Sequence, residues 1–136
     1  MNVLVDTCVW SSALRRRTTT SRDRPVVDEL GELIREKRVV MIGAVRQEIL
    51  SGIRDDALFA SIRDRLRAFP DLVPGESDYE RAASCFNSCR KRGIQGSNTD
   101  FLVCAMALGH GLSVFTTDED FMMFRDGLGV TLHSPR

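Results

Sequence analysis

The first ten residues, MNVLVDTCVW, constrain the fold more than any other part of the chain. Val3, Leu4 and Val5 form an apolar run without alternation, which is typical of a strand that other elements cover on both faces. Such a strand predicts an α/β domain in which a parallel sheet lies between helices. Asp6 follows the run directly and would lie at the carboxyl edge of that sheet, where open α/β folds bind their ligands. Asp6 is therefore the first candidate for a functional residue.

The length and charge of the chain limit what it can be. Its 136 residues predict a single domain, residues 1–136, whose hydrophobic core is large enough to need no disulfide or structural metal. The 19 Lys and Arg residues balance the 19 Asp and Glu residues, so any contact with nucleic acid must depend on local patches. Arginine-rich patches occur at residues 15–24, 63–67 and 90–92.

The cellular compartment follows from what the sequence does not contain. No uncharged stretch approaches the ~18 residues that a membrane span needs, and no targeting segment is visible. We therefore expect a cytoplasmic protein that does not contact a membrane. Cys8, Cys85, Cys89 and Cys104 include no CxxC pair, and the histidines follow no zinc-binding spacing. We expect all four cysteines to be free thiols, as is usual in the cytosol.

The hydrophobic pattern alternates between strands and helices. Apolar runs at residues 39–42 and 112–115 predict two more buried strands, and residues 129–133 predict an edge strand. Helical spacing or capping signals predict helices at residues 9–14, 25–37, 44–52, 55–69, 77–93, 99–108 and 120–124. This order predicts a three-layer α/β/α fold with a central, mostly parallel sheet of four to five strands.

Several polar patterns carry structural expectations. The basic, Thr-rich segment at residues 15–24 predicts an exposed and mobile loop, and His133 is expected at the surface. Ser77 and Glu80 fit a capping box, in which each side chain bonds a free N–H at a helix start. The charged face of helix 25–37 is expected to be solvated. That face comprises Asp28, Glu29, Glu32, Arg35 and Glu36.

Acidic residues recur where the predicted strands end. Glu48 lies one turn into the helix that follows the second strand, beside Ile49 and Leu50. Asp100 is the only charge of a helix that is apolar almost all round, and Asp118 and Asp120 follow the third strand. A structural role is available for some of them, since an acid in the first turn favours the helix dipole and Asp118 or Asp120 can cap the next helix. Their shared position nevertheless predicts that they meet Asp6 at one edge of the sheet.

A cluster of carboxylates has a definite chemistry. Crowded acids repel one another, so without a cation some of them would have to take up protons. Oxygen ligands without His or Cys suit Mg²⁺ or Mn²⁺, which bind a few carboxylates and keep waters that a phosphate can replace. This is the arrangement that metal-assisted phosphodiester cleavage requires. The pattern therefore predicts a nuclease.

Four motifs in this order resemble one family of proteins. VLVDTCVW, RQEILSG, NTDFLVCAMA and VFTTDEDF together resemble a PIN domain, and the chain is most similar to the VapC-type toxins of bacterial toxin–antitoxin pairs. The resemblance covers nearly the full chain. It implies a Mg²⁺- or Mn²⁺-dependent endoribonuclease that acts as the toxin of a type II system and cleaves RNA through a metal-activated water.

The resemblance also assigns roles to residues. Asp6, Glu48, Asp100 and Asp118 match the family's metal-binding, catalytic acids, and Asp120 matches a less regular extra acid of the metal site. In addition, Thr7 and Thr116 match positions at which the family has hydroxyl groups near the metal.

Partners follow from the same resemblance. It implies a homodimer and a cognate antitoxin protein whose tail covers the acidic groove. The segment at residues 15–24 departs from the family because it is longer than expected between the first strand and the next helix. This departure concerns the shape of the substrate cleft.

Three other protein classes fit the residues less well. A receiver domain needs paired acids after its first strand, but Asp6 is followed by Thr7, and the strand at residues 39–42 ends at Gly43. A phosphatase with an Asp-x-Asp nucleophile pair would need an acid in place of Cys8. A non-catalytic RNA- or protein-binding module on the same fold need not retain all four acids. A nuclease therefore fits the sequence best.

Overall fold

The structure of the chain, a computed structural model, describes residues 1–15 and 19–136. Its helices and strands follow one another as the sequence predicts. In chain order they are β1 (Val3–Val5), α1 (Thr7–Leu14), α2 (Arg24–Arg35), β2 (Val39–Val40), α3 (Gly43–Leu50), α4 (Asp56–Leu66), α5 (Glu76–Lys91), α6 (Asn98–His110), β3 (Ser113–Phe115) and α7 (Asp120–Leu128).

The sheet is parallel and has β1 at its centre. The strand order is β2-β1-β3, with Leu4 opposite Val40 on one side and opposite Val114 on the other. Val3, Leu4 and Val5 are fully buried, which confirms the prediction of a central strand covered on both faces. The first strand therefore places its final residue, and Asp6 after it, in the middle of the carboxyl edge.

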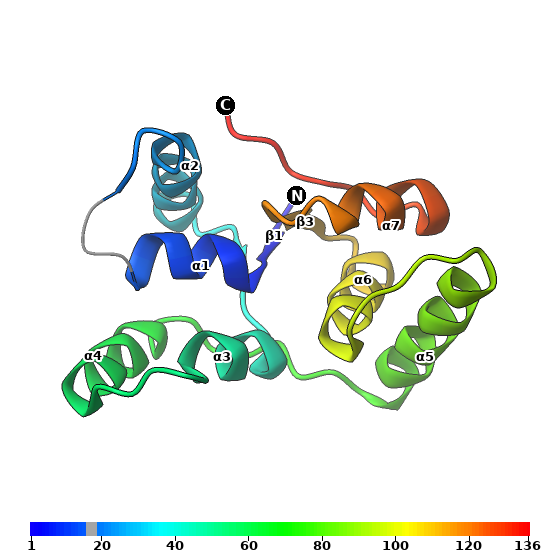
Figure 1. Cartoon of the computed structure of the whole chain (residues 1–136), viewed down its shortest axis with the longest axis horizontal. Helices are drawn as coiled ribbons and strands as arrows, with labels where there is room; N and C mark the ends of the chain where they lie inside the picture. The colour runs from blue at the N-terminus through cyan, green and yellow to red at the C-terminus, as the bar shows by residue number, and fades with distance from the viewer. Residues whose placement is uncertain (16–18) are drawn as a thin grey trace.

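The helices cover the sheet on two sides (Figure 1). In that view α1 to α4 lie to the left of the strands and α5 to α7 lie to the right. The core follows this division, because Trp10 packs against Phe69 on one side and Phe101 packs against Phe124 on the other. Residues 101–107 of α6 are all buried, as their uniformly apolar sequence predicts. The predicted three-layer α/β/α class is confirmed.

The number of strands is smaller than predicted. The described residues form three strands instead of four to five. The expected edge strand at residues 129–133 makes a single bridge, Val114 to Leu132, and Met41 makes another with Asp71. Each bridge pairs backbone groups at a single position, beside Met41 on one side of the sheet and beside Val114 on the other. Gly129 and Pro135 limit the last segment to a short extended tail.

The start of α5 differs from the prediction. The helix begins at Glu76, and the side chain of Asp78 accepts a hydrogen bond from the Gly75 backbone N–H at 2.9 Å. The expected pair of Ser77 and Glu80 is therefore wrong, and both residues are exposed. Asp78 follows Gly75 by three residues, as Glu80 follows Ser77, and the observed pair lies two residues earlier than the predicted one. The motif alone therefore did not fix where the helix starts.

The charged face of α2 is only partly solvated. Glu29 is 3% exposed, and its carboxylate accepts hydrogen bonds from His133 and from Arg136 at 2.7 and 3.1 Å. His133 is half-buried and packs edge-on against Phe115. The expectations of a solvated Glu29 and a surface His133 are both wrong, because the C-terminal tail folds back over α2 and brings these partners together.

The segment between α1 and α2 is described only in part. Residues 16–18 of the predicted loop lie outside the described residues, so its mobility remains a prediction. Of the rest, residues 19–20 have no regular structure and residues 21–23 form a turn. The next helix, α2, carries Pro25 in its first turn, as predicted. Among the described residues no helix is long and apolar enough to cross a membrane.

Candidate active site

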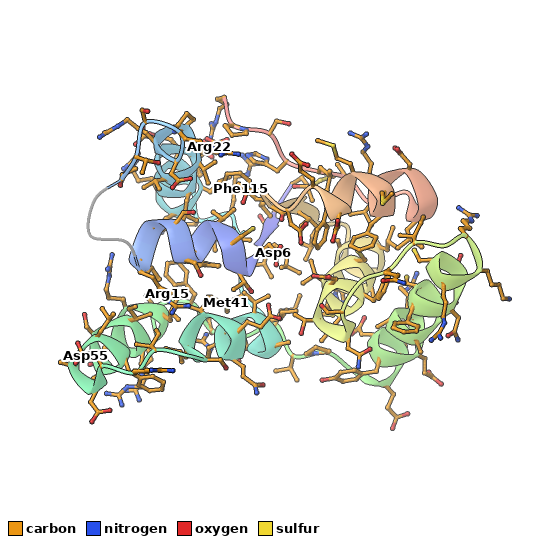
Figure 2. The ribbon with its side chains drawn as sticks, in the orientation of Figure 1. Asp6, Arg15, Arg22, Met41, Asp55 and Phe115 are labelled. Carbon is orange, nitrogen blue, oxygen red and sulfur yellow. The ribbon has the colours of Figure 1, made fainter. Side chains whose placement is uncertain are left out.

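Asp6 is fixed at the point where β1 passes into α1. Its backbone N–H donates to the carbonyl of Phe115 at 2.9 Å, which joins the ends of β1 and β3. Its side chain caps α1 by accepting a hydrogen bond from the Thr7 N–H at 2.9 Å. The second carboxylate oxygen accepts from the Thr116 hydroxyl, also at 2.9 Å. Asp6 is 6% exposed, so this carboxylate is held at the sheet edge with little freedom (Figure 2).

Thr116 links Asp6 to the acids after β3. Its hydroxyl donates to Asp6 and accepts a hydrogen bond from the Asp118 backbone N–H at 3.0 Å. The carboxylate of Asp118 in turn accepts from the Asp120 N–H at 3.0 Å. Asp118 is half-buried, whereas Asp120 is exposed as the first residue of α7. Asp118 thus belongs to the hydrogen-bonded network through both its backbone and its side chain.

Thr7 links the first strand to Glu48. The Thr7 hydroxyl donates to Glu48 Oε1 at 2.6 Å, across 41 positions of sequence. Glu48 lies in α3, and α1 and α3 pack against each other. Glu48 is exposed, and no described residue donates a hydrogen bond to its second oxygen. The two hydroxyl positions, Thr7 and Thr116, therefore connect three of the four candidate acids.

Asp100 reaches the site from the start of α6. Its carboxylate accepts from the Ser97 N–H at 3.0 Å, and the Ser97 hydroxyl accepts from the Asp100 N–H at 3.1 Å. This capping box holds Asp100 in the first turn of a helix whose next residues are buried. The structural role expected for Asp100 was a favourable interaction with the helix dipole, and the capping role of Ser97 was not predicted. The S-x-x-D spacing of SNTD was the signal that could have shown it.

The four acids lie within electrostatic reach of one another. Burial raises the pKa of the Asp6 carboxyl, and repulsion by Asp100 and Glu48 raises it further, against the lowering effect of its hydrogen bonds. Burial also raises the pKa of Asp100, and Asp118 and Glu48 add to that effect. The predicted convergence of these residues at one edge of the sheet is thus visible in their electrostatics.

The donor set suits a hard divalent cation, but the side chains are not arranged around one. No described residue forms an ion pair with any of the four acids, so their mutual repulsion is unrelieved. Within residues 1–15 and 19–136, no three Asp, Glu, His or Cys side chains approach closely enough to hold a metal ion. Glu48 and Asp100 instead bond Thr7 and Ser97. The chemistry of the site fits Mg²⁺ or Mn²⁺, and ligation by three of these acids requires some of them to change rotamer.

Cys8 is a neighbour of the site that the sequence interpretation treated only as a thiol. It is a free cysteine, as are Cys85, Cys89 and Cys104, which confirms that prediction. The Cys8 sulfur lies 3.7 Å from a carboxylate oxygen of Asp6 and accepts a hydrogen bond from the Thr117 N–H at 3.3 Å. The sequence offered one signal for this proximity. Cys8 is two residues after Asp6, in the first turn of α1, and therefore stays close to the end of the strand.

Fold and site together define a class of protein: an α/β domain with an oxygen-only acidic site at the carboxyl edge of a parallel sheet. The sequence profile of the PIN domain matches residues 3–125 of the chain. The chain therefore belongs to the PIN domain family, as its motifs suggested.

Relatives agree with this assignment along nearly the whole chain. VapC ribonuclease Mb1587 of Mycobacterium bovis and ribonuclease VapC11 of Mycobacterium tuberculosis are each 28% identical to it over 123 residues, 88% of either chain.

Two solved structures share the fold. FitAcB from Neisseria gonorrhoeae has a TM-score of 0.77 at 22% identity, covering 98% of this chain and 97% of that one. VapBC2 from Rickettsia felis, solved bound to a DNA fragment from their promoter, has a TM-score of 0.74 at 14% identity and covers 98% of both chains. The similarity to VapC-type proteins that the motifs indicated is thus confirmed.

Proposed function

We propose that this chain is a divalent-metal-dependent endoribonuclease and the toxin of a type II toxin–antitoxin pair. One observation carries the proposal. Four acids from distant parts of the chain couple electrostatically at one edge of the sheet, and two threonine hydroxyls connect three of them. Relatives that are 28% identical to this chain over 88% of their length are named ribonucleases, which supports RNA as the substrate.

The residues differ in how they would serve a metal ion. Asp6, Glu48, Asp100 and Asp118 would hold it, with Asp120 as a further candidate. Asp6 is the fixed member, because both of its oxygens are already oriented by hydrogen bonds. Glu48 and Asp100 are the adjustable members, since each is held by a bond that a cation can replace. When bound, the ion would supply a nucleophilic water and neutralise the charge that develops on the phosphate.

Purified protein incubated with total RNA tests this function. We expect new RNA ends in the presence of Mn²⁺ or Mg²⁺, none with a chelator, and none from the Asp100→Asn variant. Glu80→Gln is the matched control, because Glu80 is an exposed acid of α5 outside the site, and it should cleave like the wild type. Sequencing the ends would give the cleavage preference. RNA binding without any cleavage by the wild type would instead identify a non-catalytic binding module on the same fold.

The proposed partners are a cognate antitoxin protein and a second copy of the chain. VapBC2 of Rickettsia felis is a two-component assembly by name, and its VapC-type fold is the one found here. We place the protein in the cytoplasm with its RNA substrate. Size-exclusion chromatography with light scattering would distinguish a homodimer from a monomer, and a monomer at micromolar concentration would contradict the proposed dimer.

A further inference from the structure

A cavity of about 660 Å³ adjoins the acidic site on the side of α1 that faces α2. Its lining includes Cys8, Ser11 and Ser12 from α1, Thr20 and Arg22 from the segment before α2, and Thr117 from the loop after β3. The first and last of these residues connect the cavity to the acids. The Thr117 N–H donates to the Cys8 sulfur, and that sulfur lies 3.7 Å from Asp6. None of the four acids lines the cavity itself, and a ligand in it would be separated from Asp6 by the Cys8 side chain.

The α1 wall of the cavity presents unused hydrogen-bonding groups. Cys8, Ser11 and Ser12 stand at positions i, i+3 and i+4, which places them on one face of the helix. Ser12 is 8% exposed, and neither its hydroxyl nor that of Ser11 has a hydrogen-bond partner among the described residues. The helix rises about 6 Å from Cys8 to Ser12. This face thus forms a short track of hydroxyl groups that leads away from Asp6.

Arg22 supplies positive charge to the same cavity. Its side chain is exposed and forms no ion pair with the described residues. Figure 2 shows Arg22 beside α2, across from α1 and Asp6. Four carboxylates repel the phosphates of an RNA strand, so a strand that reaches them needs a cationic contact close by. Asp23 also lines the cavity, and its negative charge opposes the binding of a phosphate there.

We propose that this cavity binds an RNA backbone phosphate adjacent to the scissile one. Arg22 contacts the phosphate charge, and the Ser11 and Ser12 hydroxyls donate to its oxygens. Guanidinium and hydroxyl groups of this kind make most contacts to nucleic-acid backbones, and they fix the position of the strand without reading its sequence. The inference rests on the proposed ribonuclease function, and it assigns a role to the segment in which this chain departs from its family.

Binding of a short fluorescent RNA tests the subsite in the Asp100→Asn background, with Mg²⁺ present and cleavage prevented. Arg22→Ala should raise Kd on the order of tenfold and lower the slope of log Kd against log salt by about one. Ser12→Ala should raise Kd by about threefold with an unchanged slope, because a hydroxyl carries no charge. Arg81→Ala is the matched control, since Arg81 is an exposed arginine of α5 at the other side of the molecule and outside the arginine-rich patches, and it should change neither quantity.

RNAs that carry one uncharged methylphosphonate at successive positions locate the contact. The parent should lose affinity at one position next to the cleavage site, and Arg22→Ala should show no further loss there. Equal losses at every position, or an Arg22→Ala variant with unchanged Kd and salt slope, would overturn the subsite while leaving the ribonuclease intact. A wild type that neither cleaves nor binds RNA would overturn both proposals. Unchanged melting temperatures of the variants would exclude misfolding as the cause.

Discussion

At the scale of single residues, the site is organised by hydroxyl groups as much as by acids. Thr116 satisfies one oxygen of the buried Asp6 and at the same time orients the backbone of Asp118. The Thr7 hydroxyl donates to one carboxylate oxygen of Glu48. Because a buried carboxylate without partners is costly, these hydroxyls stabilise a cluster that would otherwise repel itself apart.

Removing the Thr116 hydroxyl tests this arrangement. We expect Thr116→Val to lower the free energy of unfolding by about 1–3 kcal/mol, since it leaves an Asp6 oxygen without its donor. It should also weaken Mn²⁺ binding roughly tenfold, because groups that orient ligands contribute to metal affinity. Denaturant unfolding and metal titration measure the two effects. Thr117→Val provides the control, as its hydroxyl is exposed and bonds no described residue, and equal effects from both variants would contradict the role of Thr116.

Neutralising Asp100 should separate metal binding from stability. Its raised pKa means that the folded chain favours the protonated form, so metal-free stability should fall as pH rises through the ordinary pKa of an aspartate, ~3.9. Asp100→Asn should reduce that fall and raise the metal-free Tm at pH 7 by a few degrees. The wild type, unlike Asp100→Asn, should gain about 2.7 kcal/mol of unfolding free energy from Mg²⁺ at a concentration 100 times Kd.

Thermal unfolding with and without Mg²⁺ measures these differences. Glu80→Gln should behave like the wild type in both conditions. An equal Mg²⁺ gain in Asp100→Asn and wild type would remove Asp100 from the proposed metal site.

At the scale of elements, Asp6, Asp100 and Asp118 are placed by the end of a strand or the start of a helix, whereas Glu48 lies near the C-terminal end of α3. Asp6 caps α1, and Asp100 belongs to the capping box of α6. Asp6 and Asp100 therefore have structural roles as caps, in addition to the metal-binding role that we propose for them. A cap holds the carboxylate at the sheet edge before any ligand arrives, and at Asp100 a metal ion would then replace the bond from the Ser97 N–H.

The cap of α6 can be weakened without touching an acid. Ser97→Ala removes the acceptor for the Asp100 N–H and should lower the free energy of unfolding by about 1 kcal/mol. Asp100 keeps its bond from the Ser97 N–H, so metal-dependent stabilisation should persist. Ser84→Ala in the exposed face of α5 should be neutral or slightly stabilising, because alanine favours helix interiors. Urea unfolding of the two variants compares them directly, and a larger loss for Ser84→Ala would contradict the capping role.

At the scale of the whole molecule, the C-terminal tail ties the sheet to α2. Thr131 and His133 bond the backbone of Val114 in β3, and His133 and Arg136 then reach the buried Glu29. Burial acts to raise the pKa of Glu29, but hydrogen bonds from His133 and Arg136 outweigh it and lower that pKa. The tail therefore contributes to stability in the pH range where Glu29 is ionised.

The pH dependence of this contact has a fixed sign. Because the pKa of Glu29 is lower in the folded chain, its contribution should be complete well above ~4.3, the ordinary value, and should be lost as pH falls below it. At pH 7 we expect Glu29→Ala to cost about 2–3 kcal/mol of unfolding free energy, and the difference from wild type to shrink toward pH 3. Glu32→Ala on the same helix should cost under about 0.5 kcal/mol, since its ion pair with Arg35 is exposed. Equal costs for the two variants would argue against the tail contact.

The sequence by itself determined the order of elements, the central buried strand and the place of Asp6 at the end of that strand. Local physics was sufficient for these features, since an unbroken apolar run specifies a covered strand and strand ends in a parallel sheet share one edge. It was not sufficient for the strand count or for the start of α5, because a short extended segment or an S-x-x-E spacing does not say which neighbours are available.

Only the tertiary structure decided which polar groups meet. Thr7 reaches Glu48 across 41 positions, Thr116 reaches Asp6 across 110, and Glu29 is buried by residues more than a hundred positions away. Such contacts depend on how helices pack and where the tail returns, and no local pattern encodes either. The caps at Asp6 and Asp100 are local and follow from the sequence around them, whereas the bonds from Thr7 to Glu48 and from Thr116 to Asp6 come from the packing of distant segments.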